Sequence, residues 1–187
     1  MNSFYTNNEL NKLGLATLGN NVLISRKASI YGAENIRIGN NVRIDDFCIL
    51  SGKITIGNYI HIAAYTALYG GDKGIVIQDF ANISSKIAIY SISDDYSGDS
   101  MTNPMIPEKY KNVQNEEVII ERHVIIGSGC VVLPGVVLKE GSSFGALSLI
   151  SKDSEAWSIN AGIPFKKIND RSKKILKLEN DFIKEFR

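Results

Sequence analysis

Aliphatic side chains recur every six residues along most of the chain, and the positions between them are mainly polar or small. A helix repeats its buried face every 3.6 residues and a strand every two, so a six-residue period fits neither. It predicts short flat strands joined by corners, with the aliphatic residue of each hexad, its rung, turned inward. The rungs are Leu18, Ile24, Ile30, Ile38, Ile44, Leu50, Ile56, Ile62, Leu68, Ile77, Ile83, Ile89, Ile120, Ile126, Val132, Leu138, Phe144 and Ile150.

Two further positions of the hexad carry small residues. Glycine follows the rung at several places, among them Gly39, Gly57 and Gly127, where we expect the backbone to turn tightly or to pack closely. The fourth residue after the rung is usually small or compact, and both cysteines, Cys48 and Cys130, occupy this position. We therefore expect both thiols to be buried packing residues rather than catalytic nucleophiles.

The repeat resembles the hexapeptide signature of the left-handed parallel β-helix acyltransferases, in which three hexads form one triangular coil. The eighteen rungs would then form an all-β solenoid of about six coils over residues 18–153. The hexad phase breaks near residues 34–36, 70–74 and 94–117. The last break is long, polar and contains two prolines, so we expect a loop that binds a ligand or covers a site.

Both ends of the chain are expected to cap the stack of coils, because its open ends would expose unpaired strand edges. Asn7 to Leu13 predicts a short N-terminal helix. The segment from Asp170, the expected capping residue, predicts a C-terminal amphipathic helix. With residues 157–187 as tail and helix, residues 1–187 are expected to form a single domain.

Composition narrows the range of partners. The chain of 187 residues carries 21 Lys+Arg and 20 Asp+Glu, so it lacks the basic field that holds nucleic acid. No run approaches the roughly 20 apolar residues that span a bilayer, and the first residues do not have the pattern of a signal peptide. The two cysteines lack zinc-type spacing. We therefore expect a cytoplasmic protein with no metal, no nucleic-acid partner and no membrane insertion.

Three motifs resemble, in order, those of the galactoside and maltose acetyltransferase-like branch of this family. They begin at Ile126-Gly-Ser-Gly-Cys, Phe144-Gly-Ala-Leu-Ser and Trp157-Ser-Ile-Asn-Ala. The resemblance implies a homotrimer that binds acetyl-CoA in a groove between the coils of adjacent subunits. It places the coenzyme along Gly127, Ser128, Gly145, Ala146, Ser151, Lys152, Ile163, Pro164, Lys166 and Lys167. Each position has a structural alternative, since corners need small residues and surface lysines are commonly only solvated.

Acyl transfer by such enzymes uses a base that removes a proton from the acceptor and a donor that stabilises the oxyanion. In the relatives a histidine follows the rung equivalent to Ile89, whereas this chain has Asp94 and Asp95 in that region. Of its two histidines, His61 is expected at the surface of an early coil. His123 follows the long loop and is the better candidate for the base. It could equally well be a corner histidine without a catalytic role. The two aspartates are candidates to orient the base, accept the proton or bind the acceptor, and turn formation is the alternative.

The absence of the usual base favours an amine acceptor, because an amine that has lost its ammonium proton is already a good nucleophile. The segment Ser93 to Gly98, with Asn103-Pro-Met-Ile-Pro, resembles enzymes of O-antigen and capsule assembly. Those enzymes acylate nucleotide-linked amino sugars such as dTDP-4-amino-4,6-dideoxyglucose. The resemblance makes Tyr96, Ser97 and Asn103 the candidates to bind the acceptor.

We therefore expect an acetyl-CoA-dependent sugar N-acetyltransferase of surface-polysaccharide synthesis. Two alternatives stay open: an O-acetyltransferase acting on a galactoside or glycan hydroxyl, and a trimeric scaffold without activity. A metal enzyme on the same prism, of the γ-carbonic anhydrase kind, is disfavoured because two histidines do not supply the three ligands that it needs.

Overall fold

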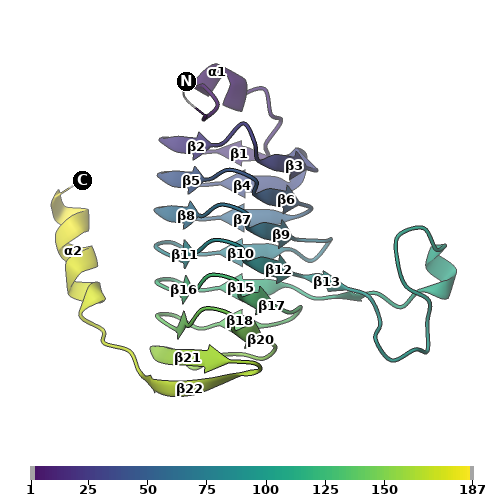
Figure 1. Ribbon diagram of the computed structural model, residues 1–187. Helices are drawn as coiled ribbons and strands as arrows, with labels where there is room; N and C mark the ends of the chain where they lie inside the picture. The colour runs from purple at the N-terminus through teal and green to yellow at the C-terminus, as the bar shows by residue number, and fades with distance from the viewer. Residues whose placement is uncertain (1–2, 186–187) are drawn as a thin grey trace.

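The computed structural model describes residues 3–185, so residues 1–2 and 186–187 of the predicted domain lie outside the described part. The chain winds into a three-sided prism (Figure 1), in which each coil contributes one strand to each of three parallel sheets. Six complete coils are followed by one strand of a seventh, β21, which continues the second sheet. The prediction of an all-β solenoid, a left-handed parallel β-helix of about six coils, is confirmed.

The strands are short except at the base of the prism. The first sheet consists of β1 (Thr17–Leu18), β4 (Ile36–Ile38), β7 (Ile54–Ile56), β10 (Ile75–Ile77), β15 (Val118–Ile120) and β18 (Val137–Leu138). The second consists of β2 (Val22–Ile24), β5 (Val42–Ile44), β8 (Ile60–Ile62), β11 (Asn82–Ile83), β16 (Ile125–Ile126), β19 (Ser143–Phe144), β21 (Ser158–Gly162) and β22 (Phe165–Asp170). The third consists of β3 (Ser29–Tyr31), β6 (Ile49–Ser51), β9 (Ala67–Tyr69), β12 (Ala88–Tyr90), β17 (Val131–Val132) and β20 (Leu149–Ile150).

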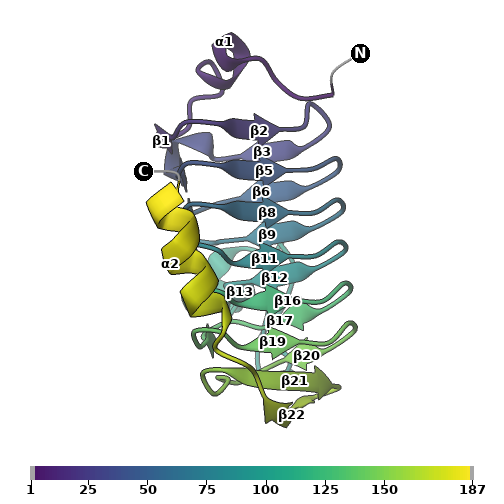
Figure 2. The same cartoon turned by 90° about the vertical axis from the view of Figure 1, so that its left-hand side faces the viewer.

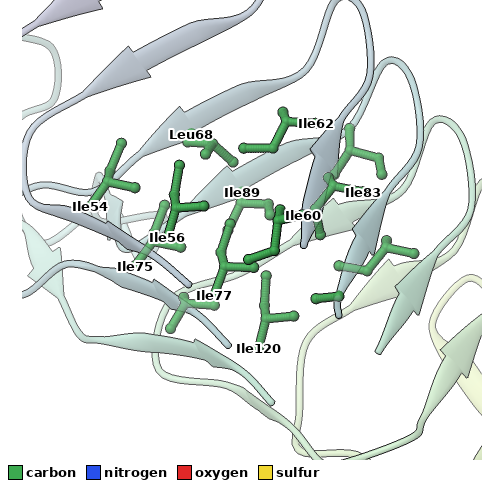
Figure 3. Packing of buried hydrophobic residues seen from close by; sticks show 14 of the residues in the cluster. Ile54, Ile56, Ile60, Ile62, Leu68, Ile75, Ile77, Ile83, Ile89 and Ile120 are labelled. Carbon is green, nitrogen blue, oxygen red and sulfur yellow. The ribbon is translucent and has the colours of Figure 1, made fainter. Parts of the chain in front are cut away.

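The rungs stack above one another because the parallel strands pair in register. Ile77 pairs with Ile56 of the coil before it and with Ile120 of the coil after it. Figure 3 shows these side chains pointing into the interior of the prism, where all three are buried. Each buried aliphatic side chain contributes roughly 1.5–3 kcal/mol relative to an exposed one, so the column of rungs is the main source of stability.

Three corners join the sheets. The first corner leads from the first sheet to the second, the second corner from the second to the third, and the third corner from the third sheet to the next coil. Residues three positions after a rung, such as Asn41 (φ 56°) and Tyr65 (φ 64°), adopt positive φ at the first and second corners. The glycine after the rung has another role, since a Cβ on Gly39 would lie 2.5 Å from the carbonyl oxygen of Gly57. Close packing of neighbouring coils therefore explains the glycines that directly follow a rung. The tight turn lies two residues further along the chain than the glycine.

All three breaks of the hexad phase are excursions from the prism. The short helix η1 (Ala33–Asn35) occupies the first break, and a turn with Gly71 and Gly74 at positive φ occupies the second. The third contains the antiparallel pair β13 (Ile92–Ser93) and β14 (Gln114–Asn115) and the short helix η2 (Glu108–Tyr110). This loop projects away from the prism at the third corner (Figure 1).

Helices lie at both ends of the chain, as predicted. Helix α1 (Asn7–Leu10) buries Leu10 above the first coil, and helix α2 (Ile175–Glu185) runs back along the coils (Figure 2). The expectation that Asp170 caps α2 is wrong. Residues up to Asp170 pair with β21 in an antiparallel hairpin at the base, so the helix begins at Ile175 instead.

Both cysteines are fully buried, as predicted. The thiols of Cys48 and Cys130 each donate to a backbone carbonyl, of Ala63 and Gly145 respectively, at 3.2 Å. Burial raises the pKa of both thiols, which suits packing and not nucleophilic attack. Within residues 3–185, no helix has the length and apolar character needed to cross a membrane.

Candidate active site

A groove of about 760 Å³ lies at the third corner, between the long loop and the lower coils. Asp94 and Tyr96 enter it from the loop, and Ser151 enters it from the segment after β20. It is also lined by Tyr90, Ile92, Ser93, Gln114, Val131, Leu133 and Pro134. The groove therefore joins a predicted catalytic residue and a predicted acceptor-binding residue to a predicted coenzyme contact.

Tyr90 forms the upper wall of this groove at the end of β12. Its ring stacks on Tyr69 of the preceding coil, with the ring centroids 5.0 Å apart, and burial raises the pKa of its hydroxyl. The groove consequently has an aromatic wall with a neutral hydroxyl at neutral pH. Tyr90 directly follows the rung Ile89 where the loop begins, and this position is the one signal in the sequence that points to it.

The other loop candidates shape the loop rather than line this groove. Asp95 accepts hydrogen bonds from the hydroxyls of Ser100 and Ser97, at 2.7 and 3.0 Å, and these lower its pKa. Asp95 also borders a smaller depression of about 450 Å³ beside Asp94 and Tyr96. Asn103 accepts from the backbone N–H of Met105 at 3.0 Å. These hydrogen bonds fit the turn-forming alternative for Asp95, and Ser97 and Asn103 take part in turns of the same loop.

The predicted coenzyme contacts divide between two corners. Gly127, Ser128, Gly145 and Ala146 lie at the second corner, after β16 and β19. A Cβ on Gly127 would lie 2.6 Å from the backbone nitrogen of Ala146, so the coils here approach closely and present a narrow surface. Ile163, 74% exposed, and Pro164 continue this surface in the turn between β21 and β22. Ser151 and Lys152 instead follow β20 at the third corner.

The predicted phosphate-binding lysines differ in whether their ammonium groups are already paired with carboxylates. The ammonium of Lys167 forms ion pairs with Asp170 (2.8 Å) and Glu155 (2.7 Å), and both carboxylates raise its pKa. Lys152 places its ammonium 5.6 Å from the centre of the Phe165 ring. Lys166 is exposed, with no ion pair among the described residues. Lys166 and Lys152 are therefore more available to an anionic group than Lys167.

The structure does not bring His123 to the long loop. His123 lies at the first corner, where its ring stacks on Phe80 with centroids 5.3 Å apart and its side chain is 2% exposed. Its Nε2 is 2.6 Å from Oε2 of Glu179 on α2. Arg122 pairs with the other oxygen of the same carboxylate. This arrangement holds α2 on the prism. The contact could not be predicted from the sequence, because Glu179 lies 56 residues away from His123 along the chain.

The ion pair under α2 predicts an acid-sensitive contribution to stability. Burial raises the pKa of Glu179, but hydrogen bonds from His123 and Arg122 outweigh it and leave the pKa below the ordinary value. A lowered carboxyl pKa adds stability above the unfolded-state value of about 4.3, and this stability disappears as the pH falls through the folded-state pKa. We expect Glu179→Gln to cost about 1–3 kcal/mol at pH 7 and much less near pH 3, measured by denaturant unfolding. Asp181→Asn, on the exposed side of α2, is the control, and an equal loss for Glu179→Gln at both pH values would contradict the assignment.

The second histidine, His61, also contacts a carboxylate, but its side chain is partly exposed to solvent. His61 is on β8, facing outward from the second sheet, and its Nε2 is 2.8 Å from Oδ2 of Asp45. Nε of Arg43 donates to the other oxygen of that carboxylate at 2.7 Å. Burial raises the pKa of Asp45, but the hydrogen bonds from His61 and Arg43 outweigh it and lower the pKa overall. Over residues 3–185, no group of three or more His, Cys, Asp or Glu residues is placed to hold a metal ion.

A prism of hexapeptide coils with a loop-enclosed groove and a corner of small residues is the architecture of a hexapeptide-repeat acyltransferase. The comparisons with known proteins agree. The chain is 52% identical over 177 residues to dTDP-4-amino-4,6-dideoxy-D-glucose acyltransferase of Escherichia coli, covering 93% of this chain and 92% of that one. It belongs to the acyltransferase family of that enzyme.

Solved structures give the same result. AntD, an N-acyltransferase from Bacillus cereus solved with dTDP-4-amino-4,6-dideoxyglucose and coenzyme A, is 55% identical with a TM-score of 0.98. That match covers 99% of this chain and 100% of AntD. The galactoside O-acetyltransferase of Lactococcus lactis is 39% identical, but over only 38% of this chain and 37% of its own length. No protein-family model matches the chain.

Proposed function

We propose that this chain transfers an acyl group from coenzyme A to the amino group of a nucleotide-linked amino-deoxysugar, with dTDP-4-amino-4,6-dideoxyglucose as the first candidate. The observation that supports the proposal is the third-corner groove, which Asp94 and Ser151 both line. The activity for which the E. coli relative is named and the complexes of AntD support the choice of substrates. Acetyl-CoA is the simplest donor, and AntD has also been solved with 3-hydroxybutyryl-CoA.

The groove suits a cationic amine better than a neutral hydroxyl. At neutral pH an amino sugar carries an ammonium group, and the carboxylate of Asp94 would bind it by a charge-assisted hydrogen bond. AntD has been solved as variants at its own Asp94 and Ser84, in complexes with coenzyme A and with dTDP or the amino sugar. This chain has Asp94 and Ser84 at the same numbers, and the match to AntD extends over nearly its whole length.

A homotrimer is part of the proposal, because the groove of one copy is chemically incomplete. A nucleotide diphosphate needs cationic partners, yet none of the residues that line the groove is lysine or arginine. The loop beside it exposes Tyr96 (93%) and Met105 (88%). The outer face of the third sheet is apolar from β6 downward, with Ile49, Ala67, Ala88, Val131 and Leu149 in one column. A second copy seated on this face would cover the apolar column and supply the missing cations.

We assign the coenzyme to the surface that Gly127, Ser128, Gly145 and Ala146 form at the second corner. The third-corner groove of an adjacent copy would face this surface and enclose the coenzyme. The exposed small side chains of Ser128 and Ala146 leave room for a pantetheine arm, whereas Gly127 lets the coils pack closely. Lys166 is available to phosphates at the base of this surface, and Lys152 is available at the third corner. A nucleotide sugar and acyl-CoA as substrates support a cytoplasmic step in the synthesis of surface-polysaccharide precursors.

The function is tested by thiol release from acetyl-CoA with a panel of acceptors. The panel contains dTDP-linked 3-amino and 4-amino sugars, a simple galactoside and maltose. We expect turnover on a dTDP-linked amino sugar and none above background on the neutral sugars. Turnover confined to galactoside or maltose would establish the O-acetyltransferase alternative, and coenzyme binding without turnover on any acceptor would favour a scaffold.

A further inference from the structure

The carboxylate of Asp94 is available to bind a ligand in the third-corner groove. It has no hydrogen-bond or ion-pair partner among residues 3–185, and it is the one charged side chain among the described residues that line the groove. The neighbouring Asp95, in contrast, accepts hydrogen bonds from Ser97 and Ser100. A cationic group that enters the groove therefore has a single anchor, and this anchor determines which other parts of the ligand contact the walls.

The walls beside this carboxylate are aliphatic. Ile92 precedes Asp94 by two residues, so the alternation of an extended chain turns both side chains to the same side, and both line the groove. The hydroxyl of Ser93 already donates to the backbone carbonyl of Asp94 at 3.2 Å. On the prism side, Val131 and Leu133 flank the buried rung of β17 and turn outward into the groove. The groove thus combines one carboxylate with apolar surface from both the loop and the coils.

Tyr90 adds a flat aromatic wall to the same groove. Its ring is braced by the ring of Tyr69 on the preceding coil, with the centroids 5.0 Å apart. A pyranose ring carries C–H groups on its faces, and such a face packs well on an aromatic ring. The groove therefore has a counterpart for three parts of an amino-deoxysugar, namely its ammonium group, its ring face and its methyl group.

We propose that Ile92 and Leu133 make the groove selective for a sugar with a methyl group, rather than a hydroxymethyl group, on the ring carbon next to the aminated carbon. This proposal rests on the proposed function and deepens it. In a 4-amino-4,6-dideoxyhexose the ammonium and the methyl group stand on neighbouring carbons. An ammonium bound by Asp94 consequently brings the methyl group to the aliphatic side chains that share the groove. A hydroxymethyl group in that place would lose its bound water without gaining a hydrogen bond from those side chains.

Two acceptors that differ by one hydroxyl group test the proposal. They are dTDP-4-amino-4,6-dideoxyglucose and dTDP-4-amino-4-deoxyglucose, and kcat/KM is measured for each by thiol release from acetyl-CoA. We expect the wild-type protein to prefer the 6-deoxy acceptor by roughly 30-fold to 100-fold, the scale on which an apolar pocket rejects an added hydroxyl. Equal values of kcat/KM for the two acceptors would overturn this proposal alone. No turnover of either acceptor would instead reject the proposed function, so the two failures are distinguishable.

Matched variants of Ile92 test whether the aliphatic wall causes the preference. Threonine and valine have the same shape, and only threonine offers a hydroxyl. We expect Ile92→Thr to lower the preference roughly threefold to tenfold, the value of one hydrogen bond to the added hydroxyl, whereas Ile92→Val should retain the preference. Leu133→Asn, which replaces an aliphatic group by an amide of similar shape, should act in the same direction as Ile92→Thr. An unchanged preference in both Ile92→Thr and Leu133→Asn would overturn the proposal.

The acyl group of the donor is the other apolar group that this wall could contact. The ratio of the rates with acetyl-CoA and butyryl-CoA, measured on the 6-deoxy acceptor, separates the two assignments. We expect Ile92→Thr to leave this ratio unchanged while it lowers the preference between acceptors. A changed donor ratio with an unchanged acceptor preference would overturn the proposal and assign the wall to the acyl chain.

Discussion

Asp94→Asn is expected to lower kcat/KM for a dTDP-linked amino sugar by about a hundredfold or more. The side chain keeps its size and enters the same groove, but it loses the charge that binds the ammonium group of the acceptor. Truncating one partner of an enclosed charge pair commonly costs about 2–5 kcal/mol, which corresponds to roughly 30-fold to several thousandfold. Steady-state thiol release with saturating acetyl-CoA measures the effect.

Asp99→Asn is the control for this substitution. Asp99 is an exposed aspartate of the same loop that does not line the groove, so its variant should retain the wild-type rate. The affinity for coenzyme A should be unchanged in both variants, because the coenzyme is assigned to the second corner. Equal rates for Asp94→Asn and wild type would remove Asp94 from the acceptor site.

Gly39→Ala is expected to cause a large loss of stability for the addition of a single methyl group. A Cβ at this position would lie 2.5 Å from the carbonyl oxygen and 2.8 Å from the carbonyl carbon of Gly57. Both are backbone atoms, so relief requires the separation of two coils rather than the rotation of a side chain. We expect a cost of about 3 kcal/mol and a fall in Tm of roughly 6–12 °C, measured by calorimetry.

Gly98→Ala separates crowding from backbone strain. Gly98 has a positive φ of 89° in the long loop, and a Cβ there would have no neighbour within 4 Å. Its variant should cost only about 1 kcal/mol, the scale of an alanine in the left-handed region. A smaller loss for Gly39→Ala than for Gly98→Ala would show that contact between the coils does not determine the choice of glycine.

The repeat made the fold predictable because one physical requirement recurs at every coil. Each rung must fill the same interior, so Ile56, Ile77 and Ile120 are aliphatic and the hexad phase is visible without an alignment. The ends of the chain follow no such repeat. Asp170 was expected to begin the C-terminal helix but lies in the hairpin of β21 and β22. Strand pairing over several residues outweighed the local preference of Asp170 for a helix cap.

The candidate site was only partly predictable. Asp94 was selected by its position in the loop and Tyr96 and Ser151 by resemblance to family motifs, and all three line the third-corner groove. His123 was selected for its nearness in sequence to the loop, but strand β15 lies between them and carries the chain from the third corner to the first, where His123 lies under Glu179. The pairing of His61 with Asp45 was not visible because the two residues lie on adjacent coils, 16 residues apart. The hexad phase determines which backbone positions stack on one another, but it does not determine which way the outward side chains turn.

The most direct test compares two acceptors that differ at one atom. Initial rates of thiol release are measured with dTDP-4-amino-4,6-dideoxyglucose and with the otherwise identical dTDP-sugar that has a hydroxyl in place of the amine, and the product is examined by mass spectrometry and NMR. The proposed function predicts at least a hundredfold preference for the amine and an amide-linked acyl group on its nitrogen. Equal or faster turnover of the hydroxyl sugar, with an ester product, would contradict it.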